Sequence, residues 1–214
     1  MTTNMDAHTT RSELDPIDPM ALRTNPALAT ASVNFDGVPV TFRMVKQDDA
    51  PILGDYFVSL SAETIRRYGP HPFDRATAEQ LCATTDPTQT LRMIGTVNNV
   101  DGERVIAYMI LILGVREADV ERYKKLGITL TPTGDCTLAP SVADAYQGKG
   151  LGSLLMVKLK RLARQLGRTR MVLWEGTQAT NNRAIRFYHK NGFRTVGEFQ
   201  EPPGFYNYDM ILDL

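Results

Sequence analysis

Apolar residues recur along the chain with two different periods, which predict an alternation of strands and amphipathic helices. The clearest helix is expected over residues 151–166, where Leu151, Leu155 and Leu159 belong to an apolar series with spacings of three and four. Shorter helices are expected over 47–60, 61–68, 75–83, 116–126 and from residue 181 to the glycine at 192. Short apolar runs predict strands over 38–45, 89–100, 103–113, 136–142, 171–174, 193–199 and 205–212.

The order of strand, helix and strand over residues 136–174 has a topological consequence. Two strands of one sheet that are joined by a helix run parallel, with a right-handed crossover. Ligands of such units bind beyond the carboxyl ends of the strands, and residues 147–152 lie there. Pro140 lies inside the first strand and has no N–H to donate, so that strand must be bulged or unpaired on one side.

The first 35 residues differ from the rest of the chain. They are rich in Thr, Asp, Pro, Asn and Ala and show little periodicity. Such a composition buries too little apolar surface to offset the entropy cost of ordering. We therefore expect residues 1–35 to be a disordered or loosely docked extension that folding does not need, or an arm that binds a partner. Residues 36–214 are expected to form one α/β domain.

Composition excludes several classes of protein. The 214 residues carry 24 basic and 24 acidic side chains, and no basic stripe stands out, so broad nucleic-acid binding is not expected. No apolar run approaches the ~20 residues of a membrane span, and the first residues do not resemble a signal peptide. Cys82 and Cys136 lie far apart, without the spacing of metal ligands. We expect a cytoplasmic monomer or homodimer with reduced thiols and no metal.

A glycine-rich segment before the 151–166 helix is the strongest candidate site. Residues 147–152 read Gln-Gly-Lys-Gly-Leu-Gly, and glycines at the N-terminus of a helix form a site for anions such as phosphate. A P-loop is excluded because Lys149 is followed by Gly150. The dinucleotide pattern G-x-G-x-x-G fails at its third glycine, which is Ser153 here. The alternative is a turn that merely caps the helix.

Two motifs in this part of the chain resemble one family. Gln147, Gly150 and Gly152 fit the pattern Q/R-x-x-G-x-G/A of the GCN5-related N-acetyltransferases (GNAT). The same family's later motif, N-x-x-A-x-x-x-Y-x-x-x-G-F, is matched by Asn181, Ala184, Tyr188, Gly192 and Phe193. Residues 60–67 are also weakly similar to the bacterial protein-lysine acetyltransferases. The resemblance implies a mixed, mostly antiparallel sheet of about seven strands, with a central parallel pair splayed at an acyl-CoA site and helices on both sides.

The resemblance also implies roles for particular residues. The loop N–H groups would hold the pyrophosphate of acetyl-CoA or coenzyme A, and the pantetheine arm would pair with the strand near Val142. Asn181 would bind the arm from the other side, although an asparagine there can also cap the helix. The implied cofactor-binding residues are Val142, Gln147, Gly148, Lys149, Gly150, Leu151, Gly152, Ser153 and Asn181.

The catalytic residues are implied less completely. Tyr188 lies at the family's general-acid position, and a phenol with its usual pKa of about 10 would lose this role near that pH. The alternative for Tyr188 is a half-buried core residue. The family often has a glutamate as base where this chain has Thr137, so the sequence departs from the pattern. Asp135 and Glu175 are the candidates in its place, and a water chain without an essential base is the third option.

Three functions follow from these residues. The first is an N-acetyltransferase that moves the acetyl group of acetyl-CoA to a primary amine on a small molecule or a protein. The second is a non-catalytic acyl-CoA sensor, because the usual glutamate is missing. The third is a nicotinamide enzyme, which depends on Gly148, Gly150 and Glu175 alone. The resemblance also marks residues 114–134 as an insertion, which could be a lid, an oligomer contact or surface decoration.

Overall fold

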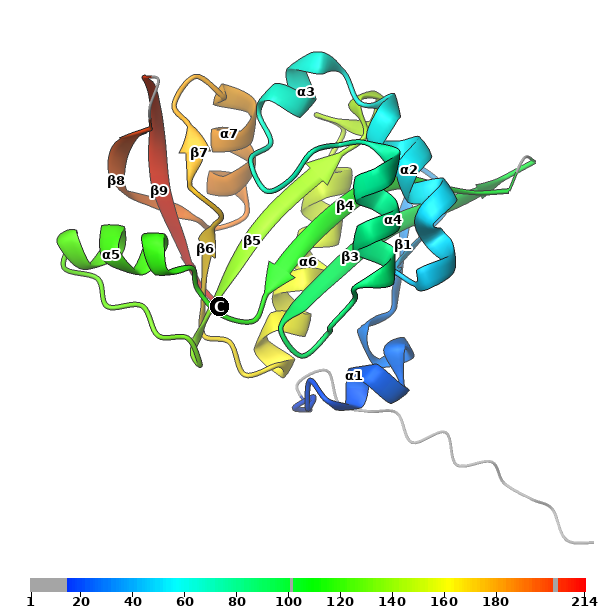
Figure 1. The fold of residues 1–214 in the computed structure, drawn as a ribbon, viewed down its shortest axis with the longest axis horizontal. Helices are drawn as coiled ribbons and strands as arrows, with labels where there is room; N and C mark the ends of the chain where they lie inside the picture. Colours follow the sequence, from blue (N-terminus) through cyan, green and yellow to red (C-terminus); the bar gives the residue numbers. More distant parts are fainter. Residues whose placement is uncertain (1–14, 101, 202–203) are drawn as a thin grey trace, which may run out of the picture.

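The computed structural model describes residues 15–100, 102–201 and 204–214, and its centre is one mixed sheet (Figure 1). The strands are β1 (Ala31–Phe35), β2 (Val38–Met44), β3 (Thr90–Asn99), β4 (Gly102–Ile112), β5 (Asp135–Val142), β6 (Arg170–Leu173), β7 (Thr177–Gln178), β8 (Arg194–Glu201) and β9 (Phe205–Asp213). The order is β1-β2-β3-β4-β5-β6-β9-β7, and β8 pairs with the other edge of β9. Among the strands of the described residues, only β5 and β6 run parallel. This confirms the mostly antiparallel sheet with one parallel pair, to which β1 and the short β7 are added.

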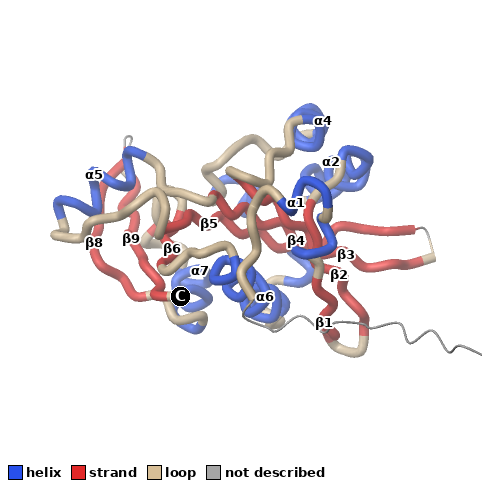
Figure 2. The backbone as a smooth tube through the Cα atoms, turned by 90° about the horizontal axis from the view of Figure 1, so that it is seen from below, coloured by secondary structure: helices blue, strands red, loops and turns tan. Residues whose placement is uncertain are grey.

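Helices cover both faces of the sheet. They are α1 (Ala21–Thr24), α2 (Ala50–Ser59), α3 (Ala62–Arg66), α4 (Arg75–Ala83), α5 (Glu117–Lys125), α6 (Leu151–Gln165) and α7 (Asn182–Lys190). Single 3-10 turns occur at Pro26–Ala29, Gln47–Asp49 and Asp144–Tyr146. Figure 2 shows α2, α4 and α5 on one side of the sheet and α6 and α7 on the other. None of the described helices combines the length and apolarity that a membrane crossing requires.

Two large apolar layers, one on each face of the sheet, hold α6 on one side and α2 and α4 on the other. Side chains of a strand alternate between its faces, so one strand contributes to both layers. On β4, Met109 and Leu111 face the layer under α6, whereas Tyr108 and Ile110 face the layer under α2 and α4. The series of leucines that predicted the 151–166 helix lies in the first layer, as its spacing requires.

The N-terminal segment differs from the expectation for residues 15–35. Ile17 and Leu22 are 4% and 1% exposed and belong to the layer under α6, and the N–H of Ile17 donates to the carbonyl of Gln165 at 2.7 Å. Residues 31–35 form β1, which pairs with β2. The expected boundary at residue 35 therefore lies inside a hairpin, and apolar side chains of this segment pack in the layer under α6. The expectation for residues 1–14 lies outside the described residues.

The parallel pair of strands separates partway along its length. β5 pairs with β6 only over residues 135–138, and the last hydrogen bond runs from the N–H of Trp174 to the carbonyl of Leu138 at 2.9 Å. Glu175 and Gly176 then take φ values of 53° and 67° and turn the chain away from β5. A Cβ at position 176 would lie 2.5 Å from a backbone oxygen, so this turn requires glycine.

The insertion over residues 114–134 packs on the sheet. Helix α5 covers β6 and β9 through a small cluster that contains Tyr123, Val172 and Ile211. The Tyr123 hydroxyl donates to the carbonyl of Met210 at 2.8 Å, and Arg122 pairs with buried Asp209 at 3.1 Å. The insertion is therefore an integral layer of this end of the fold.

Candidate active site

A cavity of about 770 Å³ lies where β5 and β6 separate. It is bordered by the end of β5, the turn after β6, the α7 helix, the loop before α6 and the segment after α3. Eight sequence-predicted residues line it: Val142, Gln147, Gly148, Gly150, Gly152, Ser153, Asn181 and Tyr188. Three do not: Lys149 is exposed outside it, the Leu151 side chain is buried in the core, and Asp135 lies elsewhere. The described residues include no group of His, Cys, Asp and Glu that could hold a metal ion.

The glycine loop presents free backbone donors to this cavity. Gly148 and Gly150 have φ values of 73° and 98°, and Gly150 is the residue from which α6 starts. Among the described residues, the N–H groups of positions 148–152 have no protein partner. Together with the positive end of the α6 dipole they form an anion site. Gly152 has a separate role, because a Cβ there would lie 3.1 Å from the Phe187 ring of α7.

Hydrogen bonds between residues 144–147 and the first turn of α3 hold the glycine loop in place. The Asp144 carboxylate accepts hydrogen bonds from the Ser61 N–H and hydroxyl, both at 2.8 Å, and from the Thr64 hydroxyl at 2.6 Å. Burial would raise the pKa of Asp144, but these hydrogen bonds outweigh it and lower the pKa. The Gln147 amide donates to the carbonyl of Val142 at 2.7 Å and to Thr64 at 3.1 Å. The loop is thus held in shape before any ligand binds.

Beyond the split, β5 has a free edge that faces the cavity. Leu138 directs its carbonyl to β6, whereas Ala143 directs its N–H to Ile106 on β4. The backbone N–H and C=O groups of successive residues in a strand point to alternate sides. Those of Pro140 and Val142 therefore point to the side of β6. The missing N–H of Pro140 therefore costs no bond to β4, and the strand is unpaired on one side rather than bulged. The Pro140 carbonyl and the Val142 N–H remain available to a ligand.

Tyr188 and Asn181 reach the cavity from α7. The Asn181 side chain caps α7 by accepting from the Ala184 N–H at 3.2 Å, so the capping interpretation of this residue is present. Tyr188 is 7% exposed, and its ring packs on Phe187 and Phe193. Its hydroxyl has no hydrogen-bond partner in the described part of the chain. Burial raises the pKa of Tyr188 well above 10, so the loss of acid function expected near pH 10 moves to higher pH.

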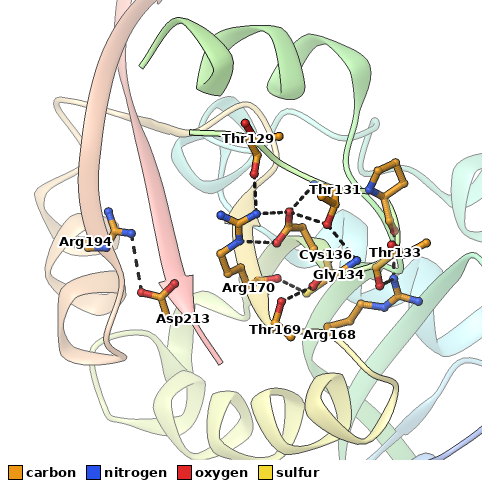
Figure 3. A network of polar contacts seen from close by, with 12 residues as sticks. Thr129, Thr131, Thr133, Gly134, Cys136, Arg168, Thr169, Arg170, Arg194 and Asp213 are labelled. Atoms are coloured by element: carbon orange, nitrogen blue, oxygen red, sulfur yellow. Dashed lines mark hydrogen bonds and ion pairs between the residues drawn. The ribbon is translucent and has the colours of Figure 1, made fainter. Parts of the chain in front are cut away.

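The structure does not bring Asp135 to this cavity. Asp135 lies at the start of β5, fully buried, and both of its carboxylate oxygens bind the Arg170 guanidinium at 2.7 Å. Figure 3 shows the polar contacts around Arg170, which also donates to the Thr129 carbonyl. Thr131 donates to Asp135 as well. The prediction relied on Asp135 and Thr137 sharing one face of the strand, but the cavity opens at the other end of β5. Thr137 is itself buried, and its hydroxyl donates to the Gly114 carbonyl at 3.0 Å. Asp135 therefore fixes β5 to β6 and the preceding loop.

Glu175, the second candidate base, does line the cavity. It lies two residues after the end of β6, at the point where the strands separate, and its carboxylate pairs with Arg116 from the insertion. The Arg116 guanidinium also lies over the Trp174 ring, 4.9 Å from its centre. Nothing in the sequence indicated Arg116, because its partners lie about 60 residues away.

The charges that line the cavity are mostly positive. Glu175 is the only acidic side chain among the described residues that border it. The basic ones are Arg66, Arg67, Arg183, Arg186 and Lys190. An anionic ligand would therefore be attracted to most of this surface, and a proton acceptor is present only at the turn after β6.

Comparisons with known proteins agree with this geometry. The model of the acetyltransferase (GNAT) family matches residues 70–193, which is more than half of the chain. The GNAT domain of PAT from S. lividans has a TM-score of 0.68 at 22% identity, covering 88% of this chain and 99% of that domain. The ribosomal-protein-S5-alanine acetyltransferase from Vibrio fischeri has a TM-score of 0.61 at 15% identity, covering 85% and 94%.

A third similar fold is the aminoglycoside acetyltransferase AAC(6')-Ib, whose structure is in complex with coenzyme A. Its TM-score is 0.58 at 23% identity, covering 81% of this chain and 94% of that one. No curated protein matches the chain in sequence. The likeness to solved structures establishes the fold, and the family model covers both motifs up to Phe193. The chain therefore belongs to the GNAT acetyltransferase family.

Proposed function

We propose that this protein is an N-acetyltransferase that moves the acetyl group of acetyl-CoA to a primary amine. One observation carries the proposal: free N–H groups of a helix start, the free edge of β5 and a protonated tyrosine all border the same cavity. A long ligand with a pyrophosphate at one end, amides along its arm and a thioester at the other matches this arrangement. Acetyl-CoA has these parts in this order.

The cofactor would lie across the split strands. Its pyrophosphate would accept from the N–H groups of residues 148–152, and the basic side chains of α7 would add positive charge. The amides of the arm would pair with the Pro140 carbonyl and the Val142 N–H, as an added strand does. Asn181 borders the same cavity and has amide hydrogens to donate. The structure of AAC(6')-Ib with coenzyme A supports this assignment of the ligand.

The chemistry then requires one base and one acid. A primary amine such as lysine has a pKa of about 10.4, so it must lose a proton before its nitrogen attacks the thioester carbon. Glu175 would take that proton, directly or through water, in place of Asp135. The N–C bond forms, the C–S bond breaks, and the departing thiolate receives a proton from the Tyr188 hydroxyl. Burial keeps this hydroxyl protonated at neutral pH because it raises the pKa of Tyr188.

Thermal unfolding with coenzyme A tests the cofactor site. Ligand at about 100 times its Kd should stabilise the wild-type protein by about 2.7 kcal/mol. Gly150→Val should lose this shift, because a branched side chain is disfavoured at a φ of 98° and crowds the anion site. Gly127→Ala, at a φ of 73° in an open turn far from the cavity, is the control and should keep the shift. Normal binding by a folded Gly150→Val variant would contradict the loop assignment.

Turnover separates the enzyme from a non-catalytic sensor. Acetyl-CoA should be consumed in the presence of at least one amine from a panel of polyamines, amino acids and lysine peptides. A sensor would show the thermal shift without turnover of any amine. The nicotinamide alternative would instead give a shift with NAD and none with coenzyme A, and family membership argues against it.

A further inference from the structure

Arg116 connects the insertion, residues 114–134, to the turn after β6, residues 174–176. Its guanidinium pairs with one oxygen of Glu175 and covers the Trp174 ring, and the Arg116 and Glu175 side chains are each 31% exposed. We propose that Arg116 is a positioning residue, which holds Glu175 and Trp174 so that the free carboxylate oxygen meets the acceptor amine. This proposal depends on the function proposed above and assigns the insertion a part in the acceptor half of the site.

The backbone at Glu175 shows why a positioning residue is needed. Glu175 has a φ of 53°, a conformation that a side chain other than glycine rarely adopts, and Gly176 continues the turn. Such a turn is retained only where surrounding contacts determine it. Arg116 binds Oε1 of Glu175, whereas Oε2 faces Gly69, where a Cβ would lie 3.3 Å away. One oxygen is thereby fixed and the other is left to act.

Arg116 can fix Glu175 because the insertion is itself anchored elsewhere. Arg116 directly precedes α5, and α5 is held to β9 by the contacts of Arg122 and Tyr123 described above. These anchors lie away from the cavity, so the guanidinium is placed independently of any ligand. Stacking on the indole adds a cation–π attraction at this partly exposed position.

The other charges near the cavity make this pairing selective. Arg66 ends α3, Arg67 follows it and pairs with Glu63, and further basic side chains extend from α7 into the cavity that Glu175 borders. Asp119 on α5 interacts electrostatically with Arg116 from the other side. Without Arg116, the carboxylate would be free to turn to another guanidinium, away from the amine. The acceptor that fits is a primary amine that reaches Oε2 past Gly69.

The test compares Arg116→Met and Arg116→Lys with the wild-type protein. Trp174 is the only tryptophan of the chain, so its fluorescence reports on this site alone. Arg116→Met should change the Trp174 emission and lower kcat/KM for the amine on the order of 10- to 100-fold, while the Kd for acetyl-CoA stays within about twofold.

Conservative and distant replacements complete the design. Arg116→Lys keeps the charge and should recover part of the lost rate. Arg75→Met is the matched control, because Arg75 forms an exposed ion pair with Asp55 and does not border the cavity. It should leave emission and kinetics unchanged.

Three results would overturn the proposal in distinguishable ways. Unchanged Trp174 emission and unchanged amine kinetics in Arg116→Met would reject the positioning role while leaving the acetyltransferase intact. Absence of acetyl-CoA binding and turnover in the wild type would reject the proposed function and the role that depends on it. An equal loss of stability and of both substrate affinities in Arg116→Met would show that Arg116 only supports the fold.

Discussion

Replacing Tyr188 by phenylalanine tests the chemistry most directly, because it removes one oxygen and keeps the ring. The rings of Phe187 and Phe193 lie 5.2 Å and 5.4 Å from the Tyr188 ring, and these contacts survive. The hydroxyl has no hydrogen-bond partner among the described residues, so its removal leaves no polar group unsatisfied. The free energy of unfolding should therefore change by less than about 0.5 kcal/mol.

The expected effect on the rate is much larger. Loss of a general acid costs about 100-fold or more in kcat, which corresponds to about 2.7 kcal/mol of barrier. Release of coenzyme A can be followed with a chromogenic thiol reagent at saturating amine. Cys82 and Cys136 should give little background, since both are buried and burial raises the pKa of their thiols to about 11 and about 12. The Kd for acetyl-CoA should stay within about twofold.

The dependence on pH distinguishes a buried phenol from an exposed one. The acid form of Tyr188 is the active form, and burial raises its pKa, so the wild-type rate should not fall between about pH 7 and pH 10. It should instead rise as the amine loses its proton. Full activity of Tyr188→Phe would remove the hydroxyl from the mechanism. A wild-type decline near pH 10 that disappears in Tyr188→Phe would show that the phenol titrates as if it were exposed.

Three further changes test the fold and the loop. Gly176→Ala should destabilise the protein by more than about 3 kcal/mol in thermal unfolding, because its Cβ would meet a backbone oxygen at 2.5 Å; Gly127→Ala, in open space, should cost only about 1–2 kcal/mol. Removal of residues 1–14 should leave the melting temperature nearly unchanged. Removal of residues 1–35 should lower it strongly, because it takes Ile17, Leu22 and Phe35 out of the apolar layer under α6. Asp144→Ala should raise the Kd for coenzyme A, measured by calorimetry. The loss of binding free energy should exceed the loss in the free energy of unfolding.

The parts of the site that were predicted from the sequence are those encoded locally. Gln147, Gly150 and Gly152 lie within six residues, and Asn181 and Tyr188 lie on one helix, so spacing alone places each group. The same holds for the amphipathic α6, whose period determines its buried face. The fold class was implied by the resemblance of the two motifs to the GNAT family, and the order of strand, helix and strand indicated the parallel pair.

The parts that were not predicted depend on contacts between distant segments. The partner of Asp135 is Arg170, 35 residues away. The position of Asp135 on the same strand face as Thr137 could not show that Arg170 occupies both of its carboxylate oxygens. The N–H of Ile17 donates to the carbonyl of Gln165, about 150 residues later, a contact that composition alone could not indicate. Arg116 reaches Glu175 from an insertion whose docking on β9 has no local signal.

The split between β5 and β6 shows how two distant segments determine one feature. On β5, Pro140 faces β6 and has no N–H, so it could not donate the hydrogen bond that would extend the parallel pair. After β6, Gly176 adopts a positive φ, and the residues that follow it, β7, pair with β9 and not with β5. Either feature alone would leave one strand with a partner in reach. Together they end the pairing on both sides, and the Val142 N–H is left facing a cavity in which only a ligand or water can satisfy it.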